Sequence, residues 1–271
     1  MTAMPQQNDT ESSPLTIVVT GAVGFIGRRV VEQLLERGVH VCAVDRVPVS
    51  DVSLPGGDYQ CVDLGQDLPV IPEASVLVHL AWEMDRSNAL AQADAVTDFA
   101  RLLDAAAQQG CRGVVALGSA EEYGEQEGCL SETMAPGTQL SAYGRAKNEA
   151  CQALEAWAQV TGIPALWLRP FIVYGPRQKG NMVIPYAVRC AQERTTAEFS
   201  TGLQYRDFVH VDDVAEGIAQ AALRVADASL SFSMCNLGGG HPVQVRLAPA
   251  GLNPRNGLDA PGLFSLGLNG V

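Results

Sequence analysis

Two residues four apart, Tyr143 and Lys147, have the types and the spacing to move a proton on and off a hydroxyl group or a ketone. They lie in the stretch SAYGRAKNEACQALEAWAQ, which is predicted to be helical, so both side chains lie on one helix face. An ammonium beside a phenol stabilises the phenolate, and we expect Lys147 to lower the pKa of Tyr143. Ser119 follows the apolar run 113–117, where open α/β sheets bind ligands, and its hydroxyl could hold a substrate oxygen. A tyrosine and a lysine at this spacing also occur on helix surfaces without any catalytic role, so the hypothesis depends on the rest of the chain.

A glycine-rich turn, TGAVGFIG, supplies the context in which such a pair would act. The apolar, β-branched run 15–20 before it predicts a buried strand, and apolar residues at helical spacing follow it. In this order, glycines allow a tight turn and a close approach of the backbone to a pyrophosphate, whose charge meets the helix N-terminus. The expected dinucleotide contacts are Gly21, Gly24, Phe25, Ile26 and Gly27.

The next predicted strand, VHVCAVD, bears on the choice of cofactor. Asp45 ends this strand about 20 residues past the turn, where a carboxylate accepts hydrogen bonds from the adenosine ribose. Arg46 follows directly and could attract the 2′-phosphate of NADP, which Asp45 would repel. Because the carboxylate lies at the strand end itself, we favour NAD over NADP.

The composition limits the possible partners. The chain has 271 residues, 47% of them hydrophobic, which is enough for one large core or two modest ones. A formal net charge of −12 disfavours nucleic acid and anionic membranes, and no apolar run has the length of a membrane span. Seven scattered cysteines without a Cys-x-x-Cys pair are expected to be reduced core thiols, with no metal site. We expect a cytoplasmic protein with a disordered polar segment at residues 1–14.

Apolar strand candidates alternate with helical stretches along the chain. The strand candidates are 15–20, 39–44, 76–80, 113–117 and 165–168, and the longest helical stretches are 88–109 and 142–161. This alternation predicts the α/β class, with a Rossmann-like, doubly wound parallel sheet that helices cover on both faces.

Several segments, in the same order, resemble the extended short-chain dehydrogenase/reductases of the NAD-dependent epimerase/dehydratase type, which act on nucleotide sugars. The segments are TGAVGFIG, HLA at 79–81, GSAEEYG, YGRAK, LRPFIVYGPRQ and RDFVHVDDVAEGI, within residues 15–245. The resemblance implies that Ser119, Tyr143 and Lys147 are catalytic and that Tyr143 and Lys147 also contact the cofactor. It implies further cofactor contacts from Asp63, Leu64, Leu80, Ala81 and Pro170. The implied substrate contacts are Trp82, Ser119, Glu121, Asn181 and Arg206.

Two of these residues keep a second interpretation. Arg206 could clamp a substrate diphosphate, or it could pair with Asp207 or Asp213. Glu121 matches the position at which family dehydratases carry a catalytic, proton-abstracting glutamate, but the residue before it is Ala120, where those enzymes often have an acidic or hydroxyl residue. Deoxy-sugar ketoreductases can also carry a glutamate there, and a solvated loop carboxylate is the plain alternative.

The end of the chain departs from the family pattern. After CNLGGGHPVQV the family continues with amphipathic helices, whereas prolines and glycines interrupt this sequence every few residues. We expect an irregular segment at 246–271, either a short natural lid or a truncated end, and favour the second. The predicted Rossmann domain comprises 15–175 with about 205–227, and a small substrate lobe comprises about 176–204 with 228–271.

The predicted function is that of an NAD(P)-dependent epimerase or dehydratase that acts on a nucleotide-diphosphate sugar through a transient ketone. A nucleotide-diphospho-4-keto-sugar reductase, which would run only the reverse hydride step, is the first alternative. A dinucleotide-sensing regulator without turnover is the second, although it would be expected to lack Tyr143 and Lys147. The helices at 88–109 and 142–161 could form the seam of a homodimer, as they do in relatives.

Overall fold

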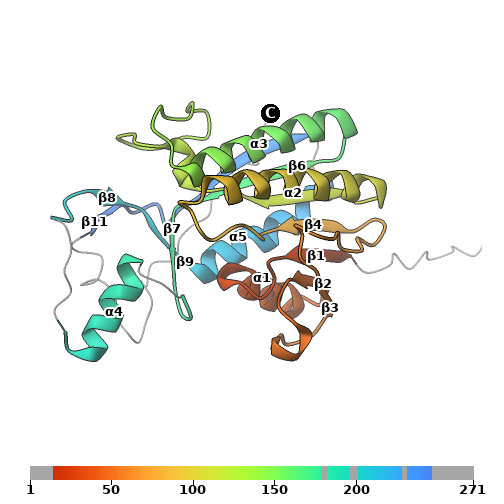
Figure 1. Ribbon diagram of the computed structural model, residues 1–271, viewed down its shortest axis with the longest axis horizontal. Coiled ribbons are helices and arrows are strands. Elements are labelled where there is room, and N and C mark those ends of the chain that lie inside the picture. The colour runs from red at the N-terminus through yellow and green to blue at the C-terminus, as the bar shows by residue number, and fades with distance from the viewer. Residues whose placement is uncertain (1–14, 179–181, 196–200, 228–230, 246–271) are drawn as a thin grey trace, which may run out of the picture.

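The computed structural model describes residues 15–178, 182–195, 201–227 and 231–245. Its centre is a seven-stranded parallel sheet of order β10-β6-β5-β4-β1-β2-β3 (Figure 1). The strands are β1 (Thr16–Thr20), β2 (His40–Asp45), β3 (Asp58–Cys61), β4 (Val76–His79), β5 (Gly113–Leu117), β6 (Ala165–Pro170) and β10 (Phe232–Leu237). The order reverses between β1 and β4, which is where open α/β sheets bind ligands. The predicted α/β class and doubly wound parallel sheet are confirmed.

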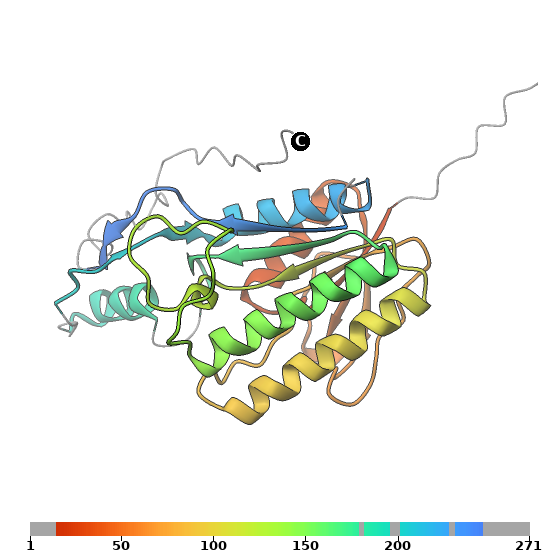
Figure 2. The same ribbon diagram turned by 90° about the horizontal axis from the view of Figure 1, so that it is seen from above.

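Two helical layers cover this sheet. Helices α2 (Ala89–Gln108) and α3 (Ala142–Thr161) pack side by side over one face (Figure 2), and α1 (Phe25–Glu36) and α5 (Val211–Arg224) pack together over the other. Alternate strand residues supply the two cores, so that Ile17 and Val19 face α1 and α5 while Val18 faces α2 and α3. Burial on both faces explains the almost unbroken apolar runs of the central strands. No helix in the described ranges is both long and apolar enough to cross a membrane.

The two edge strands of the sheet differ from the prediction. Residues 232–237 fall in the predicted substrate lobe, but they form β10, which pairs in parallel with β6. Strand β3, at the opposite edge, was not predicted as a strand. An edge strand has one neighbour and partly exposed faces, so the sequences FSMCNL and DYQC lack the apolar run that marks a central strand.

A smaller layer lies beyond the carboxyl ends of the strands. It contains α4 (Val183–Glu193), the parallel pair β7 (Ile172–Tyr174) and β9 (Phe208–His210), and the antiparallel pair β8 (Tyr205–Arg206) and β11 (Val243–Gln244). A separate small core joins Tyr174, Ile184, Phe208 and Val245. The segments 1–14 and 246–271, predicted to be disordered and irregular, lie outside the described residues, as does Asn181.

Candidate active site

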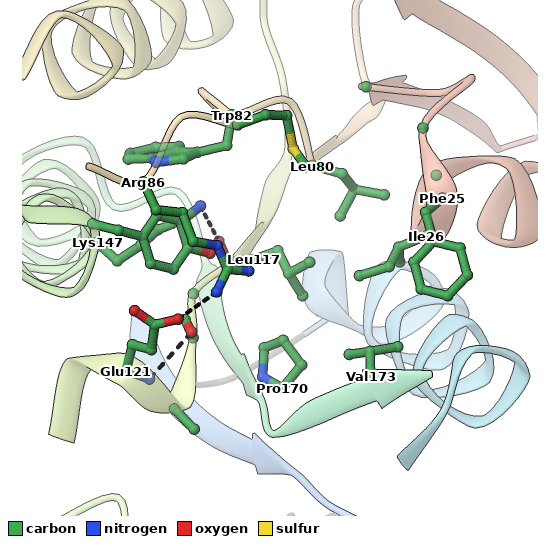
Figure 3. A pocket seen from close by; sticks show the side chains of 18 of the residues that line it. Phe25, Ile26, Leu80, Trp82, Arg86, Leu117, Glu121, Lys147, Pro170 and Val173 are labelled. Carbon is green, nitrogen blue, oxygen red and sulfur yellow. Dashed lines mark hydrogen bonds and ion pairs between the residues drawn. The ribbon is translucent and has the colours of Figure 1, made fainter. Parts of the chain in front are cut away.

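A large cleft opens at the carboxyl ends of the central strands, between the sheet and the smaller layer. Figure 3 shows Phe25 and Ile26 on one side of it, and Trp82, Lys147 and Glu121 on the other. All predicted site residues in the described part of the chain line this cleft: Gly21, Gly24, Phe25, Ile26, Gly27, Asp45, Arg46, Asp63, Leu64, Leu80, Ala81, Trp82, Ser119, Glu121, Tyr143, Lys147, Pro170 and Arg206. The fold therefore brings together residues that are far apart in the sequence, while the roles assigned to them stay predictions.

The glycine turn between β1 and α1 has the shape that a pyrophosphate needs. Gly21 has a left-handed φ of +67°, and a Cβ at Gly27 would lie 2.0 Å from the Gly21 carbonyl oxygen. Gly24 is the N-cap of α1, and no side chain caps that helix. The free N–H groups of its first turn lie at the cleft, and the glycines leave room for a close approach of a ligand to the backbone, which fits the phosphates of a dinucleotide.

The carboxylate of Asp45 is tied to the same turn. Its Oδ2 accepts a hydrogen bond from the Val23 N–H at 3.1 Å, so the end of β2 is held beside the turn. Arg46 is exposed next to it. Asp63 lies farther along the cleft, where its carboxylate accepts from the Gly65 N–H at 3.2 Å. Both carboxylates thus stabilise loops that line the cleft.

Ser119 and Tyr143 are brought together because η2 (Ala120–Tyr123) packs on the first turn of α3. Ser119 is the N-cap of η2, and its Oγ accepts from the Glu121 N–H at 3.1 Å. A Cβ at Gly144 would lie 2.5 Å from the Glu121 carbonyl oxygen, so glycine permits this close approach. The Ser119 hydroxyl interacts with the Tyr143 phenol and acts to lower its pKa.

The contacts of the Lys147 ammonium group differ from the prediction. Its Nζ donates a hydrogen bond to the Leu117 carbonyl at 2.7 Å and lies 3.5 Å from the centroid of the Trp82 ring. It is 5.9 Å from the centroid of the Tyr143 ring. Burial lowers the pKa of Lys147 to about 7, although the Glu122 carboxylate opposes this shift. The expectation that Lys147 lowers the pKa of Tyr143 is therefore wrong for this structure.

The charged group on the face of Tyr143 is instead Arg86, which sequence reasoning missed. The Arg86 Cζ lies 4.5 Å from the centroid of the phenol ring, and Arg86 also forms an ion pair with Glu121. Burial raises the pKa of Tyr143 above its ordinary value, and the Arg86 guanidinium acts against that rise. No motif marks Arg86, since it lies in a polar loop that only the fold brings to Tyr143.

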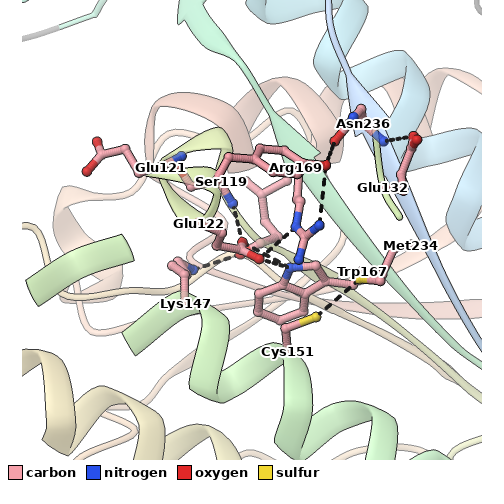
Figure 4. Close-up of polar contacts among 12 residues, drawn as sticks. Ser119, Glu121, Glu122, Glu132, Lys147, Cys151, Trp167, Arg169, Met234 and Asn236 are labelled. Atoms are coloured by element: carbon pink, nitrogen blue, oxygen red, sulfur yellow. Dashed lines mark hydrogen bonds and ion pairs between the residues drawn. The ribbon is translucent and has the colours of Figure 1, made fainter. Parts of the chain in front are cut away.

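A buried ion pair behind the site was also missed. The Arg169 Nε donates to the Glu122 Oε2 at 2.7 Å, and both side chains are almost fully buried (Figure 4). The Glu122 Oε1 accepts from the Ser119 N–H at 2.7 Å and from the Trp167 Nε1 at 3.0 Å. Glu122 therefore anchors the loop that carries Ser119. A charged residue within the apolar strand ALWLRP was the signal that could have revealed this pair.

Arg206 is exposed in the smaller layer. Its Nη1 donates to the Tyr205 carbonyl at 2.8 Å, and among the described residues no ion pair joins it to Asp207 or Asp213. Asp207 is occupied differently, because its carboxylate accepts from the N–H groups of Gly239 at 2.7 Å and Gly240 at 3.0 Å. The alternative that assigned Arg206 to an ion pair with Asp207 or Asp213 is therefore wrong.

The thiols and acidic groups of the described residues show no arrangement that could bind a metal ion. All seven cysteines are free, and within the described ranges no group of three His, Cys, Asp or Glu side chains could hold a metal ion. Most of the thiols are buried as predicted, but Cys61 and Cys129 are exposed.

The chain belongs to the NAD dependent epimerase/dehydratase family, whose model matches residues 17–238. It is 27% identical to the dTDP-6-deoxy-L-talose 4-dehydrogenase (NAD(+)) of Aggregatibacter actinomycetemcomitans, over 86% of this chain and 88% of that protein. It is 29% identical to the UDP-glucuronate 4-epimerase of Thermodesulfobacterium geofontis, over 84% of this chain and 76% of that protein. The solved structure of MoeE5 in complex with UDP-glucose and NAD matches with a TM-score of 0.71 and 31% identity, over 85% of this chain and 78% of that one. The family resemblance stated from the sequence motifs is confirmed.

Proposed function

We propose that this protein is an NAD-dependent epimerase of nucleotide-diphosphate sugars, which oxidises a sugar hydroxyl to a ketone and reduces the ketone again from its opposite face. The observation that carries the proposal is the placement of Ser119 and Tyr143 in the same cleft as the uncapped glycine turn. The similarity to UDP-sugar 4-epimerases supports the same choice of substrate class.

The residues of the chain supply the proton transfers. The Tyr143 Oη takes the proton of the sugar hydroxyl as the C–H hydrogen leaves with its electron pair, and it returns the proton when the ketone is reduced. A bound nicotinamide would supply the hydride chemistry, as the acceptor of that hydrogen and then as its donor. The Ser119 Oγ holds the reacting oxygen, and Arg206, exposed in the cleft, is placed to meet the substrate diphosphate.

A dehydratase is less well supported by the groups around Glu121. Loss of water needs a base for the proton beside the ketone and an acid for the leaving hydroxyl. Glu121 is paired with Arg86 and accepts from the Ser141 Oγ at 3.0 Å, and its neighbour Ala120 has no proton to donate. The epimerase therefore ranks first.

A single-step oxidoreductase is the second candidate, because the chain is similar to a dTDP-6-deoxy-L-talose 4-dehydrogenase over most of both proteins. The two candidates differ in redox balance. An epimerase converts many equivalents of sugar for each NAD, whereas a dehydrogenase or ketoreductase changes one cofactor molecule per turnover. We expect a UDP-glucose and UDP-glucuronate screen, followed by NMR of the sugar ring, to show conversion beyond the amount of NAD added. Product equal to the cofactor added would support the second candidate, and no conversion of any nucleotide sugar would contradict both.

We also propose that the protein is a homodimer through the outward faces of α2 and α3. These helices form one layer, and Leu90 and Val160 on them are 80% and 87% exposed. Sedimentation should give a dimer for the wild type and a monomer for Val160→Asp. A monomeric wild type would contradict this assembly.

A further inference from the structure

We propose that Arg86 is a positioning residue for Tyr143. Arg86 contacts the face of the phenol ring and stabilises the phenolate that proton transfer requires, whereas the negative charge of Glu121 opposes that phenolate. The inference rests on the proposed function only in taking Tyr143 as the group that transfers the proton. It adds a cation that none of the sequence motifs contains.

The three side chains form a connected cluster. The Arg86 Cζ lies 4.5 Å from the centroid of the Tyr143 ring, within the range of a cation–π contact. The same guanidinium forms an ion pair with the Glu121 Oε1 (Figure 3). The Glu121 Oε2 accepts from the Oγ of Ser141, the N-cap of the helix that carries Tyr143. Arg86 therefore contacts the phenol directly and the start of its helix through Glu121.

The loop that carries Arg86 is held in place by α2. Gln92 is 1% exposed, and its Nε2 donates to the carbonyls of Glu83 at 3.2 Å and Asp85 at 3.0 Å. Its Oε1 accepts from the Trp82 Nε1 at 2.8 Å. The backbone on both sides of residue 84 is thus fixed to a buried side chain. Arg86 therefore reaches Tyr143 from a loop whose backbone is held by hydrogen bonds, although its own side chain is half-exposed.

Arg86 differs from Lys147 in the permanence of its charge. Lys147, on α3, is buried with a pKa of about 7, so that near neutral pH only a fraction of the molecules carries a charged Lys147. A guanidinium stays charged throughout that range. From η2, the carboxylates of Glu121 and Glu122 oppose the phenolate and the Ser119 hydroxyl favours it. Of the two cations that the described residues place near the Tyr143 ring, Arg86 has a charge that does not depend on pH in this range.

The test is a titration of the phenol itself, without substrate. A fluorinated tyrosine placed at position 143 reports its own ionisation by ¹⁹F NMR, and its greater acidity keeps the midpoint within the range where the protein is folded. We expect Arg86→Gln to raise the midpoint by roughly one pH unit, at the low end for a neighbouring charge because Arg86 is half-exposed. We expect Glu121→Gln to lower it, since a negative charge is removed. Arg86→Lys should retain part of the effect, and Arg101→Gln, at an exposed arginine paired with Asp98 on α2, should change nothing.

The opposite directions of the midpoint shifts in Arg86→Gln and Glu121→Gln distinguish an electrostatic role of the pair from a purely structural one. If the pair only braced the loop, removing either partner would loosen the same contact and move the midpoint in one direction. Shifts of the same sign, or no shift for Arg86→Gln, would overturn the proposal. Because the titration needs no nucleotide sugar, opposite shifts in a protein without turnover would uphold the role of Arg86 and contradict the proposed function alone. Turnover together with an unchanged midpoint in Arg86→Gln would uphold the proposed function and contradict the role of Arg86.

Discussion

The ammonium of Lys147 lies over the indole of Trp82, 3.5 Å from the ring centroid, while its hydrogen bond goes to the Leu117 carbonyl. An aromatic face and a carbonyl oxygen both favour a cation, yet burial still holds the pKa of Lys147 at about 7. The folded protein therefore takes a proton at Lys147 less readily than the unfolded chain does.

This difference predicts a stability that rises with pH. An unfolded lysine has a pKa of about 10.4, so between about pH 7 and about pH 10 this residue binds more protons in the unfolded chain than in the folded one. Lys147 should therefore contribute a rise in the free energy of unfolding of the wild type across this window, by a few kcal/mol at most. Lys147→Met lacks this contribution, so that the stability gained by the variant is largest below about pH 7. Urea titrations at several pH values measure this; parallel curves for the two proteins would contradict it.

A second prediction concerns Gly27, where a Cβ would lie 2.0 Å from the Gly21 carbonyl oxygen. That contact can be relieved only by moving the turn, so Gly27→Ala should lose at least 1 kcal/mol of stability, as overpacking usually does. NAD affinity, measured by calorimetry, should fall at least about tenfold, since the N–H groups that meet the pyrophosphate would move. Gly56→Ala is the matched control, because a Cβ there meets nothing closer than 4.0 Å. Equal behaviour of the two variants would show that the turn tolerates a side chain.

The carboxylate of Asp45 should select the cofactor. Asp45→Ala removes the expected acceptor for the ribose and the partner of the Val23 N–H. We expect NAD binding to weaken by about 1.5–3 kcal/mol, the scale of a hydrogen bond to a charged group, and the preference over NADP to shrink. Asp67→Ala, at an exposed aspartate away from the cleft, should bind NAD as the wild type does. Unchanged NAD binding in Asp45→Ala, or tighter NADP binding by the wild type, would remove Asp45 from cofactor recognition.

The buried pair of Glu122 and Arg169 should matter more for stability than the surface pairs do. Glu122→Ala leaves the Arg169 charge in the interior without its partner, which costs about 3–5 kcal/mol. Asp98→Ala breaks the exposed pair with Arg101 and should cost less than about 1 kcal/mol. Thermal unfolding compares the two directly, and similar losses would contradict a structural role for the buried pair.

The sequence predicted the centre of the fold better than its edges. The five central strands and the long helices follow from apolar runs and helical periodicity, because these elements are buried and their patterns are strong. Strands β3 and β10 were missed, since an edge strand needs no such pattern. For the site, motif residues such as Ser119 and Tyr143 were found. Arg86 was not, because its contact with Tyr143 joins a loop to the first turn of α3, which only the tertiary structure places together.

The direction of the pKa of Tyr143 could not be derived from spacing either. A separation of four residues places Lys147 on the same helix face, but the choice of partner depends on what else lies within reach. The Lys147 ammonium contacts Trp82 and donates to the Leu117 carbonyl, and burial is then the largest influence on the pKa of Tyr143. Such competition is a property of packing rather than of the local sequence.

The most direct test of the account is the fate of the ring hydrogen when the wild type, with NAD, converts a UDP-sugar in deuterium oxide. Removal of hydrogen as hydride and its return to the same carbon predicts an epimer that carries protium at the inverted position, seen by NMR. Tyr143→Phe should keep its NAD affinity and lose about a hundredfold or more of the rate, because one proton-transfer oxygen is removed. Deuterium at the inverted carbon, or a Tyr143→Phe variant with half the wild-type rate, would contradict hydride transfer assisted by Tyr143.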